Sequence, residues 1–198
     1  MVFYRKSSGG VTFSGGEPLT QPDFLKAVIE ECQKLGIHVA IETCGFFSWE
    51  SAEDTVRLAD FVLFDIKHMD PDRHLRLTGR DNRQILDNLR DLSGGAAEIW
   101  IRVPVIPDVN DGPDNLEALA EVKQGTRTPI ATGERLYSRQ DFRQLLDLGC
   151  ADFIQPDCGH AGGIFEMRLI ASMAEVAYIP FCPHNPSGPV ATAANLQL

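Results

Sequence analysis

Side chains that could move protons follow two short apolar runs near the end of the chain. Asp157 follows Asp152–Gln155, and His184 follows Tyr178–Cys182. If these runs are adjacent parallel strands, about 4.8 Å apart, the carboxylate lies beside the imidazole. A carboxylate there holds one imidazole tautomer and raises the basicity of the ring, which suits a general base or acid. The pattern predicts a proton-transfer pair. The alternative is a core or cap histidine in a proline-rich loop.

Seven apolar runs alternate with helical patterns and predict the strands that position these side chains. The expected strands are Gly10–Ser14, His38–Thr43, Phe61–Ile66, Glu98–Val105, Thr128–Thr132, Asp152–Gln155 and Tyr178–Cys182. Apolar residues at helical spacing predict helices around Phe24–Cys32, Ser48–Ala59, Ile85–Leu92, Leu116–Val122, Leu145–Leu148, Ile164–Ala177 and Pro189–Leu198.

Strict alternation of strands and helices predicts an α/β fold with a parallel sheet, either doubly wound or closed as a barrel. No GxGxxG follows the first strand, which weakens a dinucleotide-binding interpretation. Polar residues follow nearly every strand and would converge on one mouth of a barrel: Glu17, Thr43, Asp65, Lys67, Arg102, Glu134, Asp157 and His184. We therefore expect a parallel, TIM-like (β/α) barrel of seven strands, partial or open.

Composition excludes several classes of protein. The 198 residues carry a formal net charge of −10, which argues against a nucleic-acid partner. No apolar run approaches the roughly 20 residues of a membrane span, and Met1–Lys6 lacks a signal-peptide pattern. The five cysteines form no CxxC spacing and predict reduced thiols in a cytoplasmic protein.

Four motifs in the first half carry a resemblance to a known family. They are Gly9–Leu19 with its GGEP sequence, Ile41–Gly45, Asp65–Asp70 and Ile101–Pro107. From about residue 3 to residue 111 the chain resembles the radical S-adenosylmethionine enzymes that activate glycyl-radical enzymes, the pyruvate formate-lyase activase type. The resemblance implies that Gly15, Gly16 and Glu17 contact S-adenosylmethionine and that Thr43, Asp65 and Lys67 line the same pocket. The alternative for Gly15-Gly16 is a tight strand-to-helix turn.

The cysteine loop of that family does not occur in this sequence. The family holds a [4Fe–4S] cluster on a CxxxCxxC loop before the GGEP strand, and none of the five cysteines here has that spacing. We therefore expect no [4Fe–4S] cluster on this chain.

The second half resembles a different family. Its motifs are Thr128–Arg135, Ile154–Asp157, His160–Ile164 and Pro183–Pro186. From about residue 115 to residue 198 the chain is similar to the barrel half of the enolase superfamily, in its galactonate dehydratase and mandelate racemase branch. The resemblance implies that Glu134 is a Mg²⁺ ligand, that Asp157 and His184 form the catalytic dyad, and that the substrate is a small-molecule acid. The alternative for Glu134 is a surface ion pair with Arg135.

The sequence thus predicts one domain made of two half barrels, residues 1–112 and 113–198, joined in a helix that suits either parent. Asp65 with Glu134 is the expected metal pair, where Lys67 would compete with the cation. We expect a remnant enolase-type site for metal-assisted proton abstraction next to a carboxylate, with little or no activity. The alternatives are an activase fragment that binds S-adenosylmethionine and a non-catalytic barrel. Open sheet edges would favour self-association.

Overall fold

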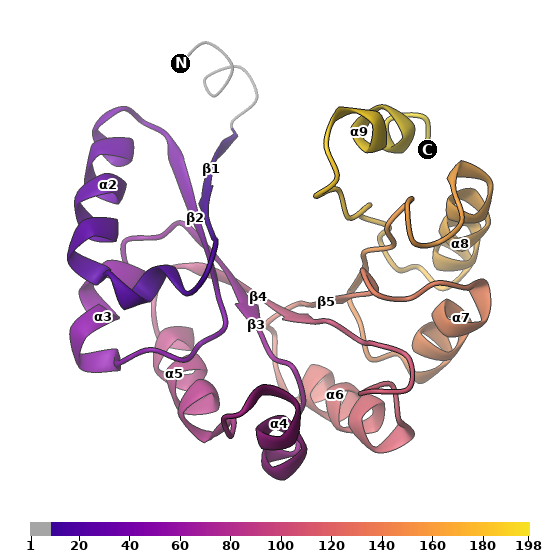
Figure 1. Cartoon of the computed structure of the whole chain (residues 1–198), viewed down its shortest axis with the longest axis horizontal. Coiled ribbons are helices and arrows are strands. Elements are labelled where there is room, and N and C mark those ends of the chain that lie inside the picture. Colours follow the sequence, from indigo (N-terminus) through magenta and orange to yellow (C-terminus); the bar gives the residue numbers. More distant parts are fainter. Residues whose placement is uncertain (1–8) are drawn as a thin grey trace. The chain divides into compact units, whose positions relative to one another are not determined.

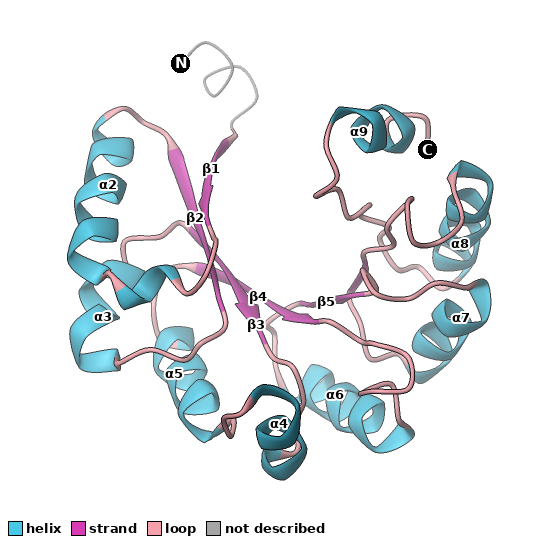
Figure 2. Cartoon of the chain, viewed as in Figure 1, coloured by secondary structure: helices cyan, strands magenta, loops and turns pink. Residues whose placement is uncertain are grey.

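The computed structural model describes residues 9–198 and shows strands alternating with helices (Figures 1 and 2). The prediction that Met1–Lys6 is no signal peptide, and the first residues of the radical S-adenosylmethionine resemblance, lie outside the described residues. The described chain forms two compact units. The first contains residues 9–66 and Leu75–Ile101, and the second contains Lys67–His74 and Arg102–Leu198.

The first unit is built on parallel strands in sequence order. Strand β1 (Gly10–Phe13) pairs with β2 (His38–Thr43), and β2 pairs with β3 (Phe61–Asp65). Strand β4 (Glu98–Val103) follows, and its last two residues belong to the second unit. Gly10 faces His38, whose carbonyl oxygen would lie 1.9 Å from any Cβ at Gly10. Only glycine therefore fits the start of β1.

Helices cover the strands of the first unit, and apolar residues from both meet in its core. Figure 1 shows α2 beside β2, and α3 packs against α2. Ile29, Ile41, Val62 and Phe64 are fully buried there. The helical elements wholly within this unit are η1 (Pro18–Thr20), α2 (Pro22–Lys34), α3 (Trp49–Val56) and α5 (Arg83–Ser93).

A helix that the sequence analysis did not anticipate, α4 (Pro71–Thr78), begins in the second unit and ends in the first. The carboxylate of Asp70 accepts the N–H of Arg73 at 2.7 Å, and Pro71 follows Asp70 directly. An aspartate followed by proline is typical of a helix start. The Asp70–Pro71 dipeptide therefore indicates the start of this helix, which the spacing of apolar residues did not predict.

The second unit contains two further strands and four complete helices. Strand β5 (Ile130–Thr132) pairs in parallel with β6 (Phe153–Ile154). A capping box between Ser138 and Asp141 begins α7, and Gly149 ends it in the left-handed conformation, φ 61°. Such a φ favours glycine because it carries no Cβ. The helices wholly within this unit are α6 (Pro113–Gly125), α7 (Arg139–Leu148), α8 (Ile164–Val176) and α9 (Pro189–Asn195).

The expectation of seven strands is wrong for the described residues, which contain six. The seventh expected strand, Tyr178–Cys182, makes only a single parallel bridge, from Phe181 to Ile154, and a second bridge joins His184, two residues after this run, to Asp157. Pro180 and Pro183 lack the N–H that a continuous ladder requires. The α/β class and the parallel strands are confirmed.

Candidate functional site

Asp157 and His184 meet in the second unit through both backbone and side chain. The backbone N–H of His184 donates to the carbonyl of Pro156 at 3.0 Å, which places the two residues in register. The Nδ1 atom of His184 lies 3.0 Å from Oδ2 of Asp157. An ionised carboxylate only accepts hydrogen bonds, so Nδ1 carries the proton and Nε2 of the neutral ring has a lone pair. Nε2 makes no hydrogen bond with the described residues.

The carboxylate of Asp157 is more buried than the imidazole of His184 and accepts a further hydrogen bond. The side chain of Asp157 is 5 % exposed and that of His184 is 27 % exposed. Burial raises the pKa of Asp157, but the hydrogen bonds from His184 and from the N–H of Gly159, together with the charges of His160 and His184, lower it below the ordinary value overall. The site therefore holds an ionised carboxylate against a solvent-accessible imidazole, as a proton-transfer dyad requires.

Glu134 follows β5 in the same unit and is buried, with 7 % of its surface exposed. Its Oε2 atom is buried and has no hydrogen-bond partner among residues 9–198. The surface ion pair with Arg135 is therefore not formed, because Glu134 is not at the surface. A buried polar oxygen without a hydrogen-bond donor carries a desolvation cost.

His160 is a neighbour of the dyad to which the sequence analysis gave no role. Its Nδ1 atom lies 2.9 Å from the carbonyl oxygen of Glu134, and its ring contacts Tyr137 with centroids 5.8 Å apart. Because a carbonyl only accepts, Nδ1 is the donor here too. Its position three residues after Asp157, in a turn, was the feature of the sequence that could have placed it near Asp157.

The described residues do not supply the expected metal site. No group of three or more histidine, cysteine, aspartate or glutamate side chains in this part of the chain could hold a metal ion. Of the expected ligands, Asp65 ends β3 in the first unit and Glu134 follows β5 in the second. Mg²⁺ requires several oxygen ligands in near-octahedral geometry, so this donor set does not fit the ion.

The expected cofactor residues divide between the two units. Glu17, Thr43 and Asp65 lie in the first unit, after or at the ends of β1, β2 and β3. Lys67 begins the second unit, where its carbonyl oxygen accepts the amide of Asn110. The backbone of Lys67 is therefore hydrogen-bonded within the second unit.

The carboxylate of Glu17 is occupied by its own chain. The hydroxyl of Thr43 lies 2.9 Å from both Glu17 oxygens, and the N–H of Cys44 donates at 2.9 Å. The N–H of Leu19 also donates to Glu17, which makes the glutamate the cap of η1. Glu17 therefore joins the end of β2 to the start of η1, and its oxygens have little capacity left for an ammonium ligand.

Gly15 and Gly16 form a bend after β1 with open space beside them. A Cβ at either position would meet nothing within 4 Å, and Gly15 has a φ of 120°. The tight-turn alternative is thus consistent with the structure, and so is a ligand that approaches this backbone closely.

Two family models match the chain and overlap in its middle. Residues 2–121 match the radical SAM superfamily, and residues 103–198 match the enolase C-terminal domain-like family. The chain belongs to the radical SAM superfamily through the longer match, and its C-terminal part is enolase-like. The prediction of a chimera is confirmed.

The similar sequences are activating enzymes. The trans-4-hydroxy-L-proline dehydratase activating enzyme of Clostridioides difficile is 48 % identical over 117 residues, 59 % of this chain and 39 % of that protein. The isethionate sulfite-lyase activating enzyme of Oleidesulfovibrio alaskensis is 42 % identical over 123 residues, 61 % of this chain and 40 % of that protein. The chain thus spans about two fifths of the length of these relatives.

Solved structures resemble the chain across both parts. A mandelate racemase/muconate lactonizing enzyme-like protein of Rubrobacter xylanophilus gives a TM-score of 0.61 at 27 % identity, covering 95 % of this chain and 51 % of that chain. A domain of pyruvate-formate lyase-activating enzyme from Bacteroides vulgatus gives 0.58 at 23 % identity, covering 89 % and 99 %. The latter likeness shows the fold alone. Within residues 9–198, no helix has the length and apolar character that crossing a membrane requires.

Proposed function

We propose that the chain is a hybrid of two half barrels whose enolase-like part keeps a proton-transfer dyad, Asp157 and His184, with little or no turnover of an acid-sugar substrate. The observation that carries the proposal is the 3.0 Å contact between Nδ1 of His184 and Oδ2 of Asp157. It leaves Nε2 as the basic atom, on a ring that solvent reaches. The proposed substrate class, a small-molecule acid, follows from the resemblance of the second half to the enolase superfamily.

In this proposal the two residues divide the work of moving one proton. Asp157 orients the ring through Nδ1 and stabilises the imidazolium after Nε2 accepts a proton. Gly159 holds the other oxygen of Asp157 at 2.7 Å, so the carboxylate cannot rotate away. Abstraction next to a carboxylate also needs stabilisation of the enediolate. The single buried carboxylate of Glu134 does not provide it, so we expect little turnover.

An assay with an aldonic acid such as galactonate tests the low-turnover part of the proposal. We expect the wild type and the His184→Ala variant to form equal, background amounts of the dehydrated keto acid, with or without Mg²⁺. Mg²⁺-dependent dehydration that His184→Ala abolishes would show that a working site forms, and the low-turnover claim would be wrong.

A second candidate function is binding of S-adenosylmethionine at the bend after β1. Membership of the radical SAM superfamily and the open space beside Gly15 and Gly16 favour it. Because Glu17 is an internal acceptor, we assign the contact to the glycine backbone. Titration of S-adenosylmethionine, followed by NMR of the Gly15 and Gly16 amides, tests this candidate. Gly16→Val places a side chain in the open space and should abolish the shifts, whereas Gly125→Ala, in α6, should not. Unchanged amides in the wild type would reject the candidate.

A further inference from the structure

Helix α9 faces solvent with its apolar side. Val190 and Leu196 are 83 % and 77 % exposed, and Ala193 between them is exposed as well. Residues spaced by three lie on one side of a helix, so these three form a single apolar face. The polar side chains of this segment make local hydrogen bonds. Thr192 accepts the side-chain amide of Asn185 at 2.7 Å, and the amide of Asn195 lies 3.5 Å from the carbonyl of His184. The larger apolar side chains therefore remain exposed to solvent.

A second apolar surface lies between α7 and α8 in the same unit. It is a groove of about 560 Å³, with an apolar floor formed by Leu146, Leu169, Met173, Val176 and Ala177. Val176, at the end of α8, is 82 % exposed. None of the residues of α9 lines this groove.

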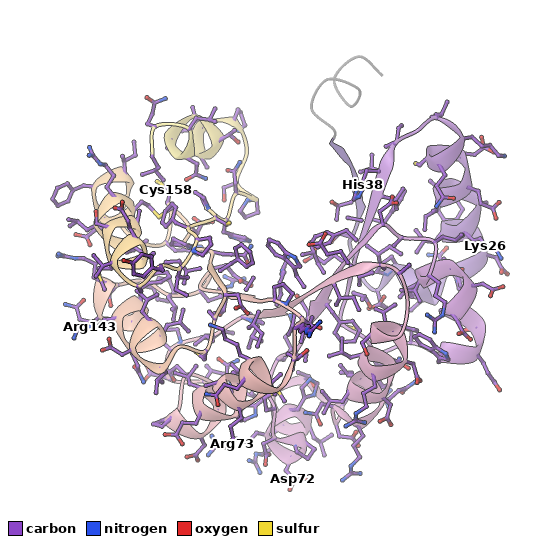
Figure 3. All side chains as sticks on the ribbon, turned by 180° about the vertical axis from the view of Figure 1, so that it is seen from behind. Lys26, His38, Asp72, Arg73, Arg143 and Cys158 are labelled. Carbon is purple, nitrogen blue, oxygen red and sulfur yellow. The ribbon has the colours of Figure 1, made fainter. Side chains whose placement is uncertain are left out.

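The charges on the rim of the groove neutralise one another. Arg139 pairs with Glu166 at 2.8 Å, and Arg143 pairs with Asp147 at 2.9 Å. Figure 3 labels Arg143 on α7 at the outer surface of the unit. The groove therefore presents apolar carbon between satisfied ion pairs and suits an uncharged occupant.

The segment around α9 is uncharged and therefore matches the neutral groove. Residues 185–198 contain no charged side chain, although the chain as a whole carries −10. A second copy of such an acidic chain is repelled over most of its surface, but not where it presents this segment. We propose that α9 of one copy docks in the α7–α8 groove of a second copy, with Val190, Ala193 and Leu196 against the apolar floor.

Because both surfaces lie in the same unit, the contact can be reciprocal and close as a two-fold dimer. The proposal differs from the self-association through open sheet edges expected from the sequence, since it uses helix faces. It is also independent of the proton-transfer dyad, so either can fail without the other.

Analytical ultracentrifugation of the full chain over a range of concentrations tests the proposal. We expect a monomer–dimer equilibrium in the wild type. Leu196→Glu, at the C-terminal cap of α9, and Val176→Glu, in the groove, should each weaken dimerisation by at least about tenfold, because each buries a charge without a partner. Both residues are exposed in the monomer, so circular dichroism should show unchanged folding. Phe24→Glu, at another exposed apolar position on α2, is the matched control and should dimerise like the wild type.

Mixing variants identifies the occupant of the groove. Leu196→Lys mixed with Val176→Glu should restore association, because the introduced charges meet across the contact. A wild type that stays monomeric at every concentration would overturn the proposal. So would a dimer that both glutamate variants leave intact, or a mixture that shows no recovery.

Discussion

The side-chain amide of Asn110 donates to the carbonyl oxygen of Lys67 at 2.8 Å and so ties the segment after β3 to the second unit. The same amide reaches the carbonyl of Pro104 at 3.0 Å, and its oxygen accepts the N–H of Ile106 at 2.6 Å. Asn115 adds a bond to the N–H of Met69. Residues Lys67–His74 lie inside the radical SAM match, yet they pack with the enolase-like unit. The compact units therefore do not coincide with the two family matches.

Replacement of Asn110 by alanine should lower the free energy of unfolding by about 1–3 kcal/mol, because it leaves buried backbone groups without partners. Urea unfolding monitored by circular dichroism measures the change. Gln140→Ala, at an exposed position on α7, is the control and should change stability by less than about 0.5 kcal/mol. Equal stability of both variants would mean that the asparagine bonds do not hold the segment.

Glu17→Gln should also destabilise the chain by about 1–3 kcal/mol. Glutamine keeps the size of the side chain but turns one acceptor toward Thr43 and Cys44 into a donor. Thermal melts of Glu17→Gln and of the exposed control Glu50→Gln provide the comparison. A melting temperature in Glu17→Gln equal to that of the control would contradict the assignment of Glu17 as an internal acceptor.

Acid should lower the free energy of unfolding of the wild type because Asp157 becomes protonated. Because the folded-state pKa of Asp157 is lowered, its carboxylate contributes stability above the unfolded-state pKa of about 3.9, and this is lost as the pH falls through the folded value. Asp157→Asn cannot titrate, so the difference in unfolding free energy between the two proteins should shrink below about pH 4. A difference that stays constant from pH 6 to pH 3 would show that Asp157 is not stabilised as an anion.

Cys150 should resist alkylation in the folded protein. It is fully buried, and burial raises its pKa to about 11, so very little thiolate forms at pH 8. Iodoacetamide labelling followed by mass spectrometry should modify the half-buried Cys32 first and Cys150 only after denaturant is added. Rapid labelling of Cys150 in buffer would indicate local unfolding around the end of α7.

Prolines explain where the observed strands are shorter than the apolar runs that predicted them. The run Thr128–Thr132 contains Pro129, and β5 begins only at Ile130. The run Glu98–Val105 contains Pro104, and β4 ends at Val103. A proline offers no N–H to a ladder, so each run is longer than the strand that forms. The runs in the first half without an internal proline gave strands with boundaries correct to within one residue.

The hydrogen-bond partners of Asp157 and of Glu17 could be predicted from the sequence to different extents. Asp157 and His184 lie on neighbouring chain segments, so register alone brings them together. The role of Glu17 depends on where the hydroxyl of Thr43 and the N–H of Cys44 point, 26 and 27 residues later. A motif does not show such donors, so the internal hydrogen bonds of Glu17 could not be predicted from the sequence.

The proton position on His184 tests the dyad most directly. Two-bond ¹H–¹⁵N correlation NMR at pH 8 should show the proton on Nδ1 in the wild type, because Oδ2 of Asp157 accepts from it. In Asp157→Asn the amide oxygen keeps the bond to Gly159, so the NH₂ group faces the ring and the proton should move to Nε2. The exposed His38 serves as the internal control and should not change. A wild-type His184 protonated on Nε2, or a tautomer that Asp157→Asn leaves unchanged, would contradict the account.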